Sequence, residues 1–253
     1  MGFNAADLKF VADLSIPLRF EGLQPNAYGV EPATSAACEY GPLIGDTRRG
    51  GSCNFERVTL IPHCNGTHTE CVGHITDERI SVRECLKDVF IPAVLVSVAP
   101  DAVDGDAIIS GPRLEDAFRA ARSDGRPPKA LIVRTLPNDD SKLSRVYGES
   151  DIPPYFAADA MEWIVASGFK HLLVDLPSID RLFDEGRLAN HRIFWNVGRG
   201  SREIDSETRI NSTVTELIYA PDHVEDGEYL LNLQIAPWDA DAAPARPLIF
   251  QID

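Results

Sequence analysis

The sequence predicts an α/β fold built on a mixed sheet, and three observations lead to this prediction. Strand and helix patterns alternate through the middle of the chain, further strand patterns lie towards both ends, and the central strands are continuously apolar. Alternation is typical of strand–helix–strand units, and continuously apolar strands are typical of sheets covered on both faces. The 253 residues contain no internal repeat or evident linker, so we expect a single domain over residues 1–253.

The N-terminal part of the chain predicts two strands separated by a long irregular segment. Residues 8–18 have the character of a strand, and residues 56–62 form a short run rich in β-branched side chains. Between them, residues 21–55 are rich in Gly, Pro, Asn and Ser and show no sustained periodicity. Such a long irregular segment is uncommon in a compact domain unless it covers a site or has a function of its own.

The middle of the chain predicts two strand–helix units. The apolar run 88–100 predicts a buried strand, and a helix is expected to begin at Ser110 and to stop at Gly125. Residues 129–135 predict the next strand, residues 153–169 contain a second helical pattern, and residues 170–180 predict a buried strand that ends in a Pro-Ser loop.

The C-terminal part predicts strands only. Residues 192–198 have the composition of a strand or a strand edge, because aromatic and β-branched side chains dominate them. Three further strands are expected over residues 212–220, 228–238 and 246–252.

The net charge of the chain limits the classes of partner that it can bind. The formal net charge is -15, from 39 acidic and 24 basic side chains. A negative surface repels phosphate backbones and anionic lipid headgroups, which argues against nucleic-acid and membrane partners. No signal peptide pattern is present, and no apolar run reaches the roughly 18 residues of a membrane-spanning helix. We therefore expect a cytoplasmic protein that acts on a small molecule, with its five cysteines as thiols.

The stretch Pro62 to His74, with the sequence PHCNGTHTECVGH, holds three of the six histidines and two of the five cysteines. If residues 67–70 are extended, His68 and Glu70 lie on one face, and imidazole with carboxylate is a common ligand pair for Zn²⁺ or Mn²⁺. His74 follows four residues later and could fold back as an acid or base. A solvent-facing polar loop remains an equal interpretation from the spacing alone.

A structural zinc site made of cysteines is a further interpretation of this part of the chain. The spacings of these cysteines match no common zinc module, so buried thiols are the better prediction for most of them. They are Cys53, Cys64, Cys71 and Cys85.

The run NGTHTECVGH resembles the signature of the putative cyclase family, which includes bacterial kynurenine formamidase. That signature reads His, any residue, Gly, Thr, His, any residue, Asp, and a last His four residues after the Asp. Gly66, Thr67, His68 and His74 match it in place. Residues 11–18, 168–198 and 213–250 resemble further segments of the family in the same order.

This resemblance implies a swivelling β/β/α-like domain that hydrolyses a carbon–nitrogen bond in a small amide, formamide or cyclic amide. It implies one or two ions, Zn²⁺ or Mn²⁺, that acidify a water and polarise the carbonyl. His74 would be the acid/base that gives a proton to the leaving nitrogen. The family also implies a homodimer or homotetramer. The metal ligands implied by position are Cys64, His68, Glu70, His191 and Glu216.

Two positions depart from the family signature. Cys64 stands where the family has its first histidine ligand, while His63 lies one residue away and a local irregularity of the chain could bring it back. Glu70 stands where the family has Asp, and its extra methylene could break a bridge between two ions. A metal-free small-molecule binding protein is therefore the alternative function, and a hydrolase with a Cys64 nucleophile and a histidine base is a third.

The remaining polar residues near these motifs are predicted to be structural. His171 begins an expected strand, and His223 lies in a loop. Asp175 and Asp180 flank the Pro-Ser turn, where we expect local hydrogen bonds to the backbone.

Overall fold

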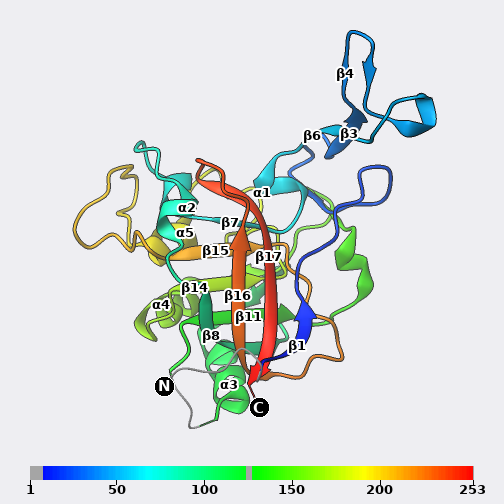
Figure 1. Ribbon diagram of the computed structural model, residues 1–253. Coiled ribbons are helices and arrows are strands. Elements are labelled where there is room, and N and C mark those ends of the chain that lie inside the picture. Colours follow the sequence, from blue (N-terminus) through cyan, green and yellow to red (C-terminus); the bar gives the residue numbers. More distant parts are fainter. Residues whose placement is uncertain (1–7, 124–126, 253) are drawn as a thin grey trace.

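A mixed sheet that closes on itself forms the centre of the molecule (Figure 1). The computed structural model describes residues 8–123 and 127–252. The sheet has the strand order β1-β17-β16-β8-β11-β14-β15-β7, and a further pairing between β7 and β17 closes it. Its strands are β1 (Leu8–Asp13), β7 (His68–Glu70), β8 (Phe90–Val98), β11 (Ala130–Thr135), β14 (His171–Val174), β15 (Thr213–Glu216), β16 (Gly227–Ile235) and β17 (Ala242–Ile252). The predicted mixed-sheet α/β fold is confirmed.

The central strands β8, β11, β14 and β15 run parallel, and the strands that close the sheet run antiparallel to their neighbours. Side chains of the parallel strands alternate between two buried cores. Val94 and Val96 belong to the core beneath the helices, whereas Leu95 belongs to the core on the other face of the sheet. Both faces of these strands are therefore buried, which explains why their sequences are continuous apolar runs.

Three helices cover one face of the sheet: α3 (Gly111–Ala121), α4 (Ala158–Ala166) and α5 (Ala189–Trp195). Leu114, Ile164 and Phe194 of these helices pack into the same core as the valines of β8. Each such fully buried side chain contributes about 1.5–3 kcal/mol to folding. The helix predicted to stop at Gly125 ends at Ala121, and Gly125 itself lies outside the described residues.

Residues 21–55 are not irregular throughout, as the sequence had indicated, but contain short strands. β3 (Thr34–Ala37) pairs with β6 (Glu56–Thr59), and β4 (Glu39–Tyr40) pairs with β5 (Leu43–Ile44). These four strands form an arm that extends away from the closed sheet in Figure 1. Tyr40 at the end of the arm is 83% exposed.

The smaller elements connect these layers. Besides the two sheets of the arm, two short sheets of the described residues lie outside the closed one. One pairs β2 (Asn26–Ala27) with β12 (Val146–Tyr147), and the other contains β9 (Asp101–Val103), β10 (Asp106–Ile109) and β13 (Tyr155–Phe156). The short helices are α1 (Pro62–Asn65) and α2 (Val82–Cys85), with 3-10 turns at Thr47–Arg49, Val72–His74 and Asp140–Leu143. None of the helices in the described ranges is long and apolar enough to cross a membrane.

The strand predicted over residues 192–198 is wrong, because these residues belong mostly to helix α5 and the turn after it. The aromatic and β-branched composition favoured a strand, but a distant carboxylate caps this helix. Asp180 accepts hydrogen bonds from the backbone N–H groups of Asn190 and His191, at 2.7 and 3.3 Å. Capping from outside the segment leaves no mark in the local sequence.

A hydrogen bond between Thr69 and Thr215 links β7 to β15. Its contribution to the stability of this strand pair can be measured. The two hydroxyl oxygens are 2.8 Å apart, and both residues are fully buried. We expect Thr69→Val or Thr215→Val alone to lower the free energy of unfolding by about 1–3 kcal/mol, because each leaves one buried hydroxyl without a partner. The double variant should lose less than the sum of the two, as measured by urea unfolding. Additive losses would contradict this interpretation.

Candidate metal centre

Strand β7 places His68 and Glu70 on one face of the sheet, as the alternation of side chains along a strand predicts. Its register against β15 sets Glu216 directly opposite His68, and its register against β17 sets Ala242 directly opposite Glu70. His68 and Glu70 are 0% and 1% exposed. The Nε2 of His68 lies 3.4 Å from Oε2 of Glu216. Two strands distant in sequence thus bring an imidazole and two carboxylates together.

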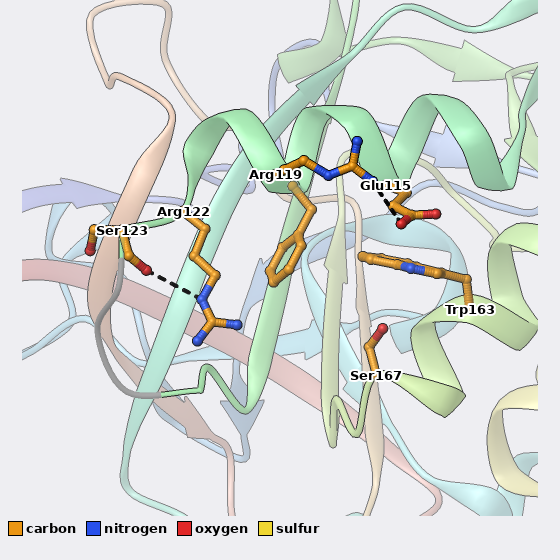
Figure 2. Close-up of a pocket in the computed structure, with 7 residues that line it drawn as sticks. Glu115, Arg119, Arg122, Ser123, Trp163 and Ser167 are labelled. Carbon is orange, nitrogen blue, oxygen red and sulfur yellow. Dashed lines mark hydrogen bonds and ion pairs between the residues drawn. The ribbon is translucent and has the colours of Figure 1, made fainter.

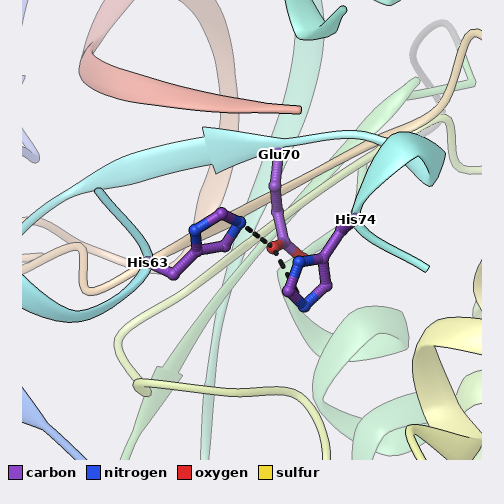
Figure 3. Close-up of side chains that lie close together, drawn as sticks. All are labelled: His63, Glu70 and His74. Atoms are coloured by element: carbon purple, nitrogen blue, oxygen red, sulfur yellow. Dashed lines mark ion pairs between the residues drawn. The ribbon is translucent and has the colours of Figure 1, made fainter. Parts of the chain in front are cut away.

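Short helical turns on either side of β7 bring in two more imidazoles. His63 lies in helix α1, before the strand, and His74 ends the 3-10 turn after it. Both rings face the carboxylate of Glu70, as Figure 3 shows. Oε2 of Glu70 lies 3.5 Å from Nε2 of His63 and 3.9 Å from Nε2 of His74. The two rings stack on each other with centroids 4.5 Å apart.

Helix α5 supplies His191, which contacts a different oxygen of Glu70 from the one that faces His63 and His74. Its Nδ1 lies 2.6 Å from Oδ2 of Asp180, and its Nε2 lies 2.9 Å from Oε1 of Glu70 and 3.7 Å from Oε1 of Glu216. Asp180 therefore caps the helix and also orients its histidine. The expected local turn bond is present, because the N–H of Asp180 donates to Oγ of Ser178 at 3.1 Å, but its carboxylate also reaches residues 190 and 191.

The donor atoms form two groups that share Glu70. We call His68, Glu70 and Glu216 the inner group, with His191 beside it, and His63, Glu70 and His74 the outer group. The inner side chains are almost fully buried, whereas those of His63 and His74 are 26% and 28% exposed. Glu70 directs Oε1 to the inner side and Oε2 to the outer side. Its carboxylate therefore lies between the two groups.

An unpaired imidazole nitrogen in each group fits a cation. His68 Nδ1 bonds to the carbonyl of Gly66 at 2.9 Å and must donate there, so in the neutral ring Nε2 carries a lone pair that faces Glu216. His68 Nε2 and His63 Nε2 are both buried and lack a hydrogen-bond partner in the described part of the chain. A lone pair facing a carboxylate is unfavourable unless a proton or a metal cation lies between them. Burial opposes a charged His68, yet Glu216 and Glu70 raise its pKa. Ligands about 2.1 Å from a tetrahedral ion lie roughly 3.4 Å apart, which agrees with these contacts.

The electrostatics of the centre favour positive charge. Burial alone would raise the pKa of Glu70, but the imidazoles of His74, His191 and His63 hold it below its usual value. Burial opposes a charged His191, yet Glu70 and Asp180 raise its pKa well above the usual value. Carboxylates that attract a proton in this way also attract a divalent cation, and binding a metal would displace protons from the imidazoles.

Asp241, which the sequence did not single out, faces the outer group. It immediately precedes β17, and its Oδ2 lies 3.0 Å from Nε2 of His63 and 3.5 Å from Nδ1 of His74. The contact with His63 lacks hydrogen-bond geometry. Polar contacts with these two histidines lower the pKa of Asp241 below its usual value. No local pattern around residue 241 indicates this role, because the pairing of β17 with β7 creates it.

Cys64 lies outside both groups of donor atoms formed by the described residues. Its side chain is buried, and burial together with Glu216 raises the pKa of its thiol to about 11. No hydrogen bond among the described residues joins it to His74 or His191, so the nucleophile hypothesis gains no support. The turn of helix α1 brings His63 to the centre instead. Cys64 as a ligand stays a prediction.

The other polar residues named from the sequence lie elsewhere. His171 is buried and contacts Thr213 and Asp88, and His223 is exposed in its loop. Asp175 accepts from the backbone and side chain of Thr135 and pairs with the buried Lys142 at 2.7 Å. A surface hollow between α3 and α4, with Arg119 and Trp163 in its lining, is shown in Figure 2 and shares no residue with the centre.

Comparisons with known proteins agree with this geometry. Residues 12–181 match the family described as Putative cyclase. The chain belongs to this family. Its relatives include the kynurenine formamidase of Bacillus thuringiensis (strain Al Hakam), 27% identical over 201 residues, with 79% of this chain and 81% of the relative covered. The kynurenine formamidase of Bacillus anthracis is 26% identical over 209 residues, with 82% and 85% covered.

Solved structures share the fold of this family member. A potential metal-dependent hydrolase with cyclase activity superposes with a TM-score of 0.64 at 17% identity, covering 97% of this chain and 99% of the other. Isatin hydrolase A from Labrenzia aggregata, bound to benzyl benzoate, superposes with a TM-score of 0.65 at 14% identity, covering 98% and 96%. The family assignment made from the motif is confirmed, and at these identities the structures support the fold.

The position of Asp180 generates a prediction about the inner group. Asp180→Ala leaves two backbone N–H groups and the Nδ1 of His191 without an acceptor. We expect it to lower the free energy of unfolding of the metal-free protein by about 1–3 kcal/mol in urea unfolding. Glu207→Ala, which removes an exposed carboxylate, should change it by less than about 0.5 kcal/mol. Equal effects of the two substitutions would show that Asp180 does not hold His191.

Proposed function

We propose that this protein is a metal-dependent hydrolase that breaks a carbon–nitrogen bond in a small amide, formamide or cyclic amide. The observation that carries the proposal is the pair of donor groups that share Glu70. The relatives named kynurenine formamidase and the neighbours named isatin hydrolase support it. The alternative of a metal-free binding protein gains no support from Glu70, which lies among three histidines.

The inner group is the proposed principal cation site. His68, Glu70, His191 and Glu216 offer two imidazoles and two carboxylates, a donor set that suits Zn²⁺ or Mn²⁺. Asp180 accepts from Nδ1 of His191 and leaves Nε2 free for the ion, a common way of orienting a ligating histidine. A cation held there would polarise the substrate carbonyl and lower the pKa of a water. The more exposed outer group offers a weaker second site through His63 and Glu70.

His74 is the proposed acid/base. In the outer group, Nε2 of His74 lies farther from the Glu70 carboxylate than Nε2 of His63 does. The ring of His74 is also partly exposed to solvent. In the proposed reaction, water adds to the carbonyl carbon and loses a proton to Nε2 of His74. The carbon–nitrogen bond then breaks, its electron pair stays on nitrogen, and His74 returns the proton to that nitrogen. The products are a carboxylic acid and an amine, and His74 ends unchanged.

Two finer expectations belong to the same proposal. We propose an assembly of two or four copies, which the arm of β3, β4, β5 and β6 supports, because exposed apolar side chains such as Tyr40 and Val58 line it. We propose a cytoplasmic location, which the unpaired state of all five cysteines supports.

Metal content tests the proposal directly. Protein purified without chelator or histidine tag should hold about one equivalent of zinc or manganese by elemental mass spectrometry, and a second after incubation with that metal. His68→Ala should lose the first equivalent and slow hydrolysis of a panel of formanilides and cyclic amides at least about a hundredfold. His223→Ala removes an exposed histidine far from the donor groups and should change neither value. Protein that binds no metal even after incubation would refute the mechanism.

A second pair of variants tests which residue fills the first ligand position. His63→Ala should lose the second equivalent and keep the first, because His63 belongs only to the outer group. Cys64→Ala should keep both, because its thiol stays protonated and lies outside both groups. Loss of metal in Cys64→Ala with retention in His63→Ala would instead make Cys64 the ligand, as its position in the family signature implies.

A further inference from the structure

Asp241 is the one carboxylate that contacts both imidazoles of the outer group and does not belong to either donor group of the described residues. Its backbone is fixed independently of its side chain, because its carbonyl accepts a 3.0 Å hydrogen bond from the N–H of Cys71. The next residue, Ala242, is paired with Glu70 where β17 and β7 close the sheet. The side chain is 31% exposed and stands at the edge of the centre, next to solvent.

The imidazole of His74 stands between two carboxylates. Its Nδ1 faces Oδ2 of Asp241 at 3.5 Å, and its Nε2 faces Oε2 of Glu70 at 3.9 Å. A neutral imidazole carries one proton, and the nitrogen that keeps it is the one beside the better acceptor. Asp241 therefore favours the tautomer with hydrogen on Nδ1 and leaves the lone pair of Nε2 directed at the centre. The stacked ring of His63 limits rotation of His74 away from this orientation.

We propose that Asp241 is a positioning residue for His74: it holds the proton on Nδ1, so that Nε2 is the atom that exchanges protons with water and with the leaving nitrogen. This inference rests on the proposed function and deepens it. Asp241 itself touches neither substrate nor metal in this proposal. Without its carboxylate, Nε2 would keep the proton in the neutral ring and could no longer accept one from water.

The matched substitutions are Asp241→Asn and Asp239→Asn. Asn preserves the shape of Asp241 but can donate to Nδ1 of His74, which favours the wrong tautomer. Asp239 lies two residues away in the same loop, is exposed, and loses the same charge when replaced. His74→Gln assigns the resonances of the His74 ring and should retain both equivalents of metal.

The first readout needs no substrate. Long-range ¹H–¹⁵N spectra of the zinc-loaded protein report which ring nitrogen carries the proton. At a pH where the His74 ring is neutral, the wild type and Asp239→Asn should show hydrogen on Nδ1, and Asp241→Asn should show hydrogen on Nε2. The same tautomer in the wild type and Asp241→Asn would overturn the proposal.

The second readout uses an amide that the wild type hydrolyses. Asp241→Asn should lower kcat about 10- to 100-fold with little change in KM, while metal content stays that of the wild type. Asp241→Glu should recover part of the lost rate. Loss of an equivalent of metal in Asp241→Asn would make Asp241 a ligand and overturn the positioning role. A wild type that binds metal but hydrolyses no amide would refute the proposed function, and the tautomer spectra would still decide the role of Asp241.

Discussion

Strand β7 is three residues long, yet it is hydrogen-bonded along both edges, to β15 and to β17. The closed sheet and the candidate metal centre both depend on this double pairing. One edge fixes Glu216 opposite His68, and the other brings Asp241 beside the outer histidines. The hydroxyl of Thr67, just before the strand, accepts from the N–H of Ile16 and donates to the carbonyl of Leu217. A slip of one residue in either pairing would turn His68 and Glu70 away from the centre.

Solvent exposure increases across the candidate centre, from the inner group to the outer group. The inner group lies among side chains with almost no exposure, where charges interact strongly and unpaired polar atoms are costly. The histidines of the outer group are about one quarter exposed, so a water or a leaving amine can reach them. Glu70 connects the two environments through its two oxygens. A buried candidate cation site beside an accessible imidazole suits the amide hydrolysis proposed for this chain.

The sequence predicted the parts of the fold that depend on local patterns. The apolar runs of β8, β11 and β14 identified buried strands, and the alternation in residues 67–70 placed His68 and Glu70 on one face. Helix α5 was missed because Asp180, ten residues before Asn190, caps it from outside the helix segment. Strands β3, β4 and β5 of the arm were missed because their side chains are largely exposed and show no sustained apolar alternation, whereas the run of β-branched side chains predicted β6. The contact between His63 and Asp241 was not predictable from the sequence. The single turn of helix α1 positions His63, and the pairing of β17 with β7 positions Asp241.

The closure of the sheet by β17 also orders the events of protein synthesis. Strand β7 leaves the ribosome well before β17, because about 170 residues separate them. Until β17 emerges, one edge of β7 has no partner and the outer histidines lack Asp241. Contacts between such distant segments form late in folding, after the local helices and the central strands. A nascent chain therefore carries the motif histidines before Asp241 stands beside them, and the outer group acquires this carboxylate only when β17 has been made.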